Sequence, residues 1–179
     1  MDIGIISHRY AKAIYQFASE RKEEDRLREE LKVLSGQLLA LPLLQKTLND
    51  PTISAAVKIK LLSTATAGKD VSDICRKAFH LIIKNKRVNY LQSIVLMYDT
   101  VYRKEKNIVI MKLVTTEPAS DNVKNKLVDL VGKDHNKVEF KTHTDTDLIG
   151  GFVLEIEDLR LDASVKNLLN QLRQELIHA

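Results

Sequence analysis

The chain has 179 residues, enough for one large domain or two small ones with cores of their own. Its 44% hydrophobic and 29% charged residues are typical of a globular protein, and no apolar run approaches the roughly 20 residues needed to cross a bilayer. The net charge of +4 comes from 28 basic and 24 acidic residues that are dispersed, whereas nucleic-acid-binding proteins usually gather basic residues on one face. Cys75 is the single cysteine, which excludes an internal disulfide and a cysteine-based zinc site. Since the N-terminus lacks the pattern of a signal peptide, we expect a cytosolic protein without a presequence.

The first hundred residues predict one helix after another, from Ile3 to about Lys104. Helical periodicity is interrupted at Pro42, Pro51, Gly68 and near Asn85. We therefore expect six helices: Ile3 to Ser19, Glu24 to Ala40, and four that begin near Pro42, Ser54, Asp70 and Val88.

The pattern changes after Lys106, where β-branched residues and alternation with period two replace helical spacing. The segments "NIVIMKLVTTE" and "KVEFKTH" predict strands, and "SDNVKNKLVDLVGK" between them predicts a helix. We expect two domains: an all-α six-helix bundle over residues 1–105 and a small α+β domain over residues 106–179, with a short β-sheet and flanking helices.

The stretch "GGFVLEIEDLRLDAS" predicts two strands joined by a tight turn near Asp158. Gly150 and Gly151 enter a strand, and they lack the lysine of a phosphate loop and the third glycine of a dinucleotide fingerprint. They are therefore expected to permit a bend or close backbone packing. Asp162 and Ser164 are expected to cap the last helix. Its apolar residues recur at helical spacing: Val165, Leu168, Leu169, Leu172 and Leu176.

No motif for catalysis, for a cofactor or for a metal is recognisable. The five histidines do not form a His-x-x-x-His pair with an acid between them, and no Cys-His cluster exists. Asp145 and Asp147 alternate with threonines, but the glycine and the glutamate of a calcium loop are not at the required spacing. A general acid-base pair is not excluded by sequence, since acids are plentiful, but no residue pattern singles one out.

Two helices carry more apolar surface than one bundle core requires. At 100° per residue, the apolar side chains of the first helix span an arc of roughly 160° and those of the fifth an arc of roughly 200°, while the main leucine seam of the second spans only about 80°. Two interpretations remain open. Both helices are central in their own bundle, or their surplus edges form a groove for an amphipathic helix of another protein.

The sequence resembles the delta subunit of bacterial F-type ATP synthases, the oligomycin-sensitivity-conferring protein family, over nearly its whole length. The segments "RYAKAIYQFA", "NDPTIS" and "LIIKNKRVNYLQSIVLMY" resemble the family's first helix, its asparagine-proline break and its fifth-to-sixth helix junction. The C-terminal signature is carried by Asp147, Leu148, Ile149, Gly150, Gly151, Asp162, Ser164, Val165 and Leu172. The sequence departs from the family pattern in three places: Glu157 and Ala163 stand where glycine is usual, and Ala55-Ala56 replaces acids beside Lys58.

The resemblance implies a non-catalytic stator component that joins the catalytic head to the peripheral stalk, so that ion flow is coupled to ATP synthesis. It implies a groove between the first and fifth helices that binds the N-terminal helix of an alpha subunit. The residues expected there are Ile6, Tyr10, Ala13, Ile14, Phe17, Ala78, Leu81 and Ile82. It further implies that residues 106–179 contact the b subunits, and that the protein lies on the cytoplasmic side of a bacterial inner membrane without inserting into it.

Two other functions have less support in the sequence. A basic nucleic-acid-binding adaptor is supported only by the pI of 9.1 and by the run "KNKR" at 84–87. The chain has 5% aromatic residues and no evident base-stacking platform. A small hydrolase or transferase has no positive support in the sequence.

Overall fold

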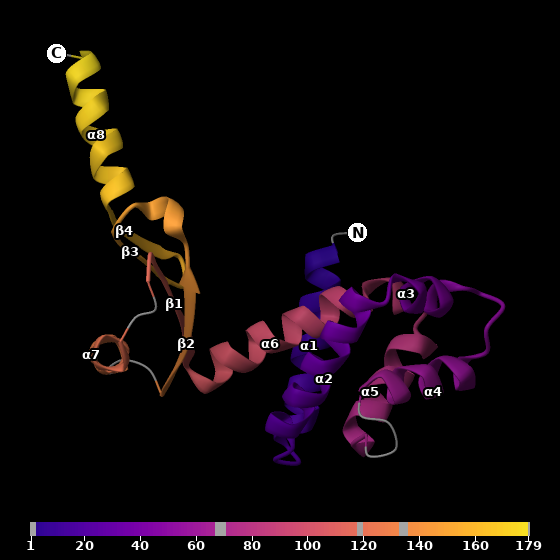
Figure 1. Ribbon diagram of the computed structural model, residues 1–179. Coiled ribbons are helices and arrows are strands. Elements are labelled where there is room, and N and C mark those ends of the chain that lie inside the picture. The colour runs from indigo at the N-terminus through magenta and orange to yellow at the C-terminus, as the bar shows by residue number, and fades with distance from the viewer. Residues whose placement is uncertain (1–2, 67–70, 118–119, 133–135, 179) are drawn as a thin grey trace. The chain divides into compact units, whose positions relative to one another are not determined.

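The fold is described from a computed structural model, which describes residues 3–66, 71–117, 120–132 and 136–178. The chain divides into two compact units, Met1–Tyr102 and Arg103–Ala179. The first is helical, and the second contains a four-stranded mixed sheet with helices (Figure 1). The predicted fold class is confirmed.

The described part of the N-terminal unit contains the six predicted α-helices and one short 3₁₀ turn. They are α1 (Ile3–Ser19), α2 (Glu24–Ala40), α3 (Pro42–Asn49), α4 (Ala55–Thr66), α5 (Asp73–Lys84), η2 (Val88–Tyr90) and α6 (Leu91–Lys106). The fifth helix was expected near Asp70, which lies outside the described residues, as does the expected break at Gly68. It begins instead at Asp73, because the Ser72 hydroxyl accepts a hydrogen bond from the Cys75 amide and caps the helix.

The core of the bundle is organised around α2. Four leucines of the predicted seam are buried, namely Leu27, Leu31, Leu34 and Leu38, while Val33 and Leu39 outside the seam are exposed. The start of α2 is tied to α6 by polar contacts. Tyr102 donates a 2.6 Å hydrogen bond to Asp25, and the Nε of Arg28 lies 2.7 Å from the Asp99 carboxylate. Helices far apart in the sequence are thereby held in one unit.

A buried carboxylate fixes the first turn of α5. Glu30 of α2 is only 7% exposed, and it accepts hydrogen bonds from the Ser72 amide at 2.9 Å and from the Ser72 hydroxyl at 2.6 Å. Arg26 lies 3.2 Å from the same carboxylate and supplies the compensating charge. Since Ser72 also caps α5, Glu30 determines where this helix starts and which helix it starts against.

The second unit is built on β1, whose residues are the most buried of the sheet. Its elements are β1 (Ile108–Thr115), α7 (Asp121–Val131), β2 (Lys137–Thr144), η3 (Thr146–Leu148), β3 (Gly151–Ile156), β4 (Leu159–Ser164) and α8 (Val165–His178). The strand order is β2-β1-β3-β4, with β1 and β2 parallel and the other pairs antiparallel. Parallel strands need a crossover, and α7 supplies it.

Backbone packing at the start of β3 requires glycine. Gly151 has φ +76°, and a Cβ atom there would overlap the carbonyl oxygen of Ala163 on β4. A Cβ atom on Gly150 would lie 3.1 Å from the side chain of Val165, at the first turn of α8. In the β3–β4 turn, Glu157 has φ +50°, so a non-glycine residue adopts the left-handed conformation there. This is one of the positions where the sequence departs from the family pattern.

Candidate docking surfaces

One side of α1 packs into the bundle and the other remains accessible. Ile6 and Ile14 are buried, Tyr10 and Phe17 are half-buried, and Ala13 is exposed. Because these side chains lie within one arc of the helix, the core uses only part of the apolar surface of α1.

On α5 the division between buried and exposed residues is sharper. Ala78 is 6% exposed and Ile82 is 2% exposed, so both belong to the core, whereas Leu81 is 41% exposed. The wide apolar arc of α5 therefore serves mainly the interior of the bundle. Among the described residues of α5, Leu81 is the large apolar residue whose side chain is exposed.

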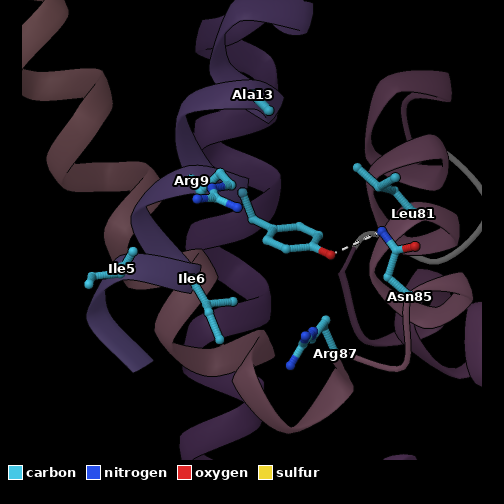
Figure 2. A pocket seen from close by; sticks show the side chains of 8 residues that line it. Ile5, Ile6, Arg9, Ala13, Leu81, Asn85 and Arg87 are labelled. Carbon is cyan, nitrogen blue, oxygen red and sulfur yellow. Dashed lines mark hydrogen bonds between the residues drawn. The ribbon is translucent and has the colours of Figure 1, made fainter. Parts of the chain in front are cut away.

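The exposed edges of α1 and α5 meet at a cavity of about 410 Å³. We call this cavity the α1–α5 groove; its lining residues are Ile5, Ile6, Arg9, Tyr10, Ala13, Leu81, Asn85 and Arg87. Figure 2 shows Ala13 and Arg9 on α1 facing Leu81 and Asn85 across it. The two walls are joined at one point, where the Asn85 amide donates a 3.0 Å hydrogen bond to the Tyr10 hydroxyl. The groove is mainly apolar, with polar groups at its edges.

The groove contains four of the eight residues named from the sequence. Ile6, Tyr10, Ala13 and Leu81 line it, while Ile14, Ala78 and Ile82 lie in the core. Phe17 does not line the groove. Its ring makes cation–π contacts with Arg21, at 4.5 Å from the ring centroid, and with Lys77, at 6.0 Å.

Four lining residues were not named from the sequence: Ile5, Arg9, Asn85 and Arg87. Asn85 and Arg87 follow the last residue of α5, so helical periodicity could not place them. In the sequence, the basic charge of the run "KNKR" at 84–87 supported only the alternative of a nucleic-acid-binding adaptor. Arg87 in fact lies on the groove, and its guanidinium is 5.8 Å from the ring centroid of Tyr90.

A second apolar surface lies on α8, which packs against β4 and η3 and then extends away from the sheet (Figure 1). Its apolar residues are exposed to between 39% and 80%: Val165, Leu168, Leu169, Leu172 and Leu176. At 100° per residue these five fall within an arc of roughly 100°. We call this stripe the α8 face.

The start of α8 is formed by local hydrogen bonds. The Ser164 hydroxyl accepts a 3.2 Å bond from the Asn167 amide, and the Asp162 carboxylate accepts bonds from the hydroxyl and the amide of Ser164. The hydrogen bond from the Ser164 hydroxyl, followed by that from its amide, lowers the pKa of Asp162 below its usual value. Asp162 and Ser164 therefore form a structural cap.

The described residues offer little that would support metal binding or nucleophilic catalysis. They contain no cluster of three or more His, Cys, Asp or Glu side chains that could hold a metal ion. Burial raises the pKa of the Cys75 thiol far above its ordinary value, which makes it a poor nucleophile. No helix in the described ranges is long and apolar enough to span a membrane. What the surface does offer is two apolar faces suited to helices of other proteins.

Comparison with known proteins gives consistent results. The family model described as ATP synthase delta (OSCP) subunit matches residues 6–176. The ATP synthase subunit delta of Phocaeicola vulgatus is 39% identical over 178 residues, covering 99% of this chain and 96% of that protein. The subunit delta of Azobacteroides pseudotrichonymphae is 42% identical, covering 98% of this chain and the whole of that protein. A chain in the cryo-EM structure of the Toxoplasma gondii mitochondrial ATP synthase hexamer has the same fold, with a TM-score of 0.68 at 19% identity, covering 96% of this chain and 97% of that one.

Proposed function

Because this chain belongs to the ATP synthase delta (OSCP) subunit family and is thus a non-catalytic stator component of F-type ATP synthase, we propose that it joins the catalytic head to the peripheral stalk through its two apolar faces. The α1–α5 groove binds the N-terminal helix of an alpha subunit. The α8 face and the neighbouring sheet bind the b subunits. In this role the protein resists rotation of the head, so that ion flow is coupled to ATP synthesis.

The cavity between α1 and α5 is the main support for an alpha-subunit helix as the partner. Ile6 and Ala13 lie seven residues apart on one face of α1, which corresponds to a length of about 10 Å, or two helical turns. Leu81 stands on the opposite wall. An amphipathic helix whose anchors recur every three or four residues matches a groove of this length and character.

A stator contact needs slow dissociation more than it needs reactive groups. Apolar anchors seated in a pocket and shielded from water dominate the binding energy of such interfaces, and differences in affinity reside mostly in the dissociation rate. Tyr10 suits this role, since its ring can bury apolar area while its hydroxyl stays bonded to Asn85.

A peptide titration tests the groove. We expect the full-length protein to bind a peptide that copies the N-terminal helix of the alpha subunit, and we expect Ala13→Asp to weaken binding at least about 30-fold, because the carboxylate would be buried against apolar side chains. Ala13 is exposed, so helicity measured by circular dichroism should not change. His8→Asp is the matched control, since His8 is exposed on α1 but does not line the groove.

A second variant keeps the test decisive if Ala13→Asp perturbs the fold. Leu81→Asn alters the opposite wall at a residue that is 41% exposed, and it should also weaken the peptide. Unchanged affinity in both folded variants would place the alpha-subunit site elsewhere on the protein.

The second half of the proposal is supported by the α8 face. Its five apolar residues have no covering element among the residues that the structure describes, and their arc is as narrow as the seam of a helix that pairs with another helix. The b subunits of a peripheral stalk are the partners we assign to it.

The protein is a subunit of a membrane-bound complex, peripheral to the membrane, and its similar proteins include bacterial subunits. We place it on the cytoplasmic side of the inner membrane, where it is held by the complex and not by direct insertion into lipid. Fractionation of membranes from cells that lack the other stalk subunits would test this, because the protein should then leave the membrane fraction.

A further inference from the structure

The polar edge of the α1–α5 groove has one sign of charge. Arg9 and Arg87 line the cavity together with Asn85 and the Tyr10 hydroxyl, and no acidic residue is among its lining residues. Figure 2 shows Arg9 on the α1 wall and Arg87 at the end of the groove opposite to Ala13. In the described part of the chain, neither arginine forms an ion pair.

The position of Arg9 places it beside the apolar floor of the groove. It is three residues after Ile6 and four before Ala13, so the three side chains share one face of α1. A carboxylate at the border of an apolar stripe on a docked helix would therefore reach Arg9 while the stripe contacts Ile6 and Ala13.

The other side of Leu81 is also cationic. A second open cavity, of about 490 Å³, is lined by Ile59, Arg76, Lys77, His80, Leu81 and Lys84. Leu81 lines both cavities. Lys77 is paired with Asp73 at 2.6 Å. Because no acidic residue is among the lining residues of this second cavity, basic groups outnumber acidic groups there. The basic residues of this second cavity do not line the groove, so Arg9 and Arg87 are the cations among the groove's lining residues.

We propose that the groove selects an amphipathic helix that carries carboxylates beside its apolar stripe, and that Arg9 and Arg87 are the residues that determine this specificity. The proposal rests on the groove being the docking site, and it adds the chemistry of the partner. A helix with amides or lysines at these positions would leave the guanidinium groups partly desolvated and without a counter-charge.

Arginine is suited to this task. Its planar guanidinium can bind a carboxylate through two parallel hydrogen bonds, and it remains charged at any physiological pH. The pairs lie at the rim of the interface, where they contribute to the association rate and to partner choice more than to the total binding energy.

The test uses three designed helical peptides that share one apolar stripe and differ only at the residues bordering it, which are glutamate, glutamine or lysine. We expect the full-length protein to prefer the glutamate peptide over the glutamine peptide by about fivefold to tenfold, and to bind the lysine peptide least. The preference should decrease as salt is raised.

The arginines are then removed one at a time and together. Arg9→Gln and Arg87→Gln should each reduce the preference for glutamate over glutamine, and the double variant should abolish it. Lys12→Gln and Lys86→Gln are the matched controls, since each removes one exposed positive charge beside an arginine without altering the groove lining. A preference that persists in the double variant, or that is lost equally in the controls, would overturn the proposal.

The alpha-subunit peptide separates this proposal from the assigned function. If that peptide binds, and replacing its acidic residues by amides leaves its affinity unchanged, the specificity proposal is wrong while the docking function stands. If it fails to bind but the glutamate peptide binds in an arginine-dependent way, the groove is selective and its assigned partner is wrong. Failure of every peptide to bind would overturn both.

Discussion

The α1–α5 groove and the α8 face both expose apolar side chains, but their origins differ. The groove is formed by residues from Ile5 to Arg87, so it exists only when two helices far apart in the sequence are packed together. The α8 face consists of one helix, whose start is capped by residues two and three positions apart. One surface depends on tertiary structure, and the other depends mainly on local structure.

This difference determines what each surface can recognise. The groove holds its hydroxyl, amide and guanidinium groups at fixed places around an apolar floor, so it can discriminate among helices. The α8 face offers a row of leucines without a concave wall, and the helix packs mainly against β4 and the η3 turn. Because isolated helices of about 14 residues are marginally stable in water, we expect α8 to gain stability from its partner.

We expect the largest effect on stability from Glu30, whose buried carboxylate tests whether the groove depends on tertiary structure. Glu30→Ala removes the buried carboxylate that holds Ser72 and leaves the Ser72 amide without its partner, at a cost of about 3 kcal/mol in the free energy of unfolding. Since α5 forms one wall of the groove, the alpha-subunit peptide should also bind more weakly. Chemical denaturation followed by circular dichroism measures the first effect, and peptide titration measures the second.

Glu29→Ala is the control for Glu30, because Glu29 is the exposed neighbour on the same helix and should change the free energy of unfolding by less than about 0.5 kcal/mol. Equal effects of the two substitutions would mean that the buried carboxylate does not hold α5, and the contrast between tertiary and local dependence would fail.

A smaller effect is expected on the α8 face. Leu172 is 48% exposed, so Leu172→Asp should leave the melting temperature unchanged, while it weakens binding of a C-terminal b-subunit segment by about 30-fold through loss of an apolar anchor. Calorimetric titration measures the affinity. The same substitution should leave the alpha-subunit peptide unaffected.

Gln171→Asp provides the matched change on α8, since Gln171 is exposed and points about 100° away from Leu172 around the helix, outside the apolar arc. Equal losses in both variants would indicate a general charge effect and would remove the support for a docking stripe.

The smallest effect concerns the β3–β4 turn. Glu157 adopts φ +50°, a conformation that favours glycine, so Glu157→Gly should raise the free energy of unfolding by about 0.5 kcal/mol. Asp158→Gly should act in the opposite direction, because Asp158 has no positive φ and would gain only unfolded-state freedom. Thermal melts of both variants measure the sign, and the same sign for both would contradict the assignment of strain to Glu157.

Most of the fold could be predicted from local patterns. Helical periodicity located α1 and α2, and alternation followed by a cap located β3, β4 and α8. The start of α5 could not be located to the residue, because its cap depends on Glu30, 42 positions earlier, and no spacing rule connects such a pair.

The candidate groove could be predicted only in part, for a similar reason. Apolar arcs identified the two helices, but an arc does not show which of its edges faces the core. Ile14, Ala78 and Ile82 turned inward, while Ala13 and Leu81 remained at the surface. Arg87 could not be foreseen, since it follows the helix in an irregular segment whose direction depends on the packing around it.

Cys75 lies on α5, within the core, with none of its surface exposed. Because it is the chain's single cysteine and its pKa is raised, a thiol-specific alkylating reagent can reach the sulfur only when α5 moves away from the helices that cover it. The unmodified protein therefore carries its own reporter of local opening at the wall of the groove. Its rate of labelling would record how much an occupant slows that opening.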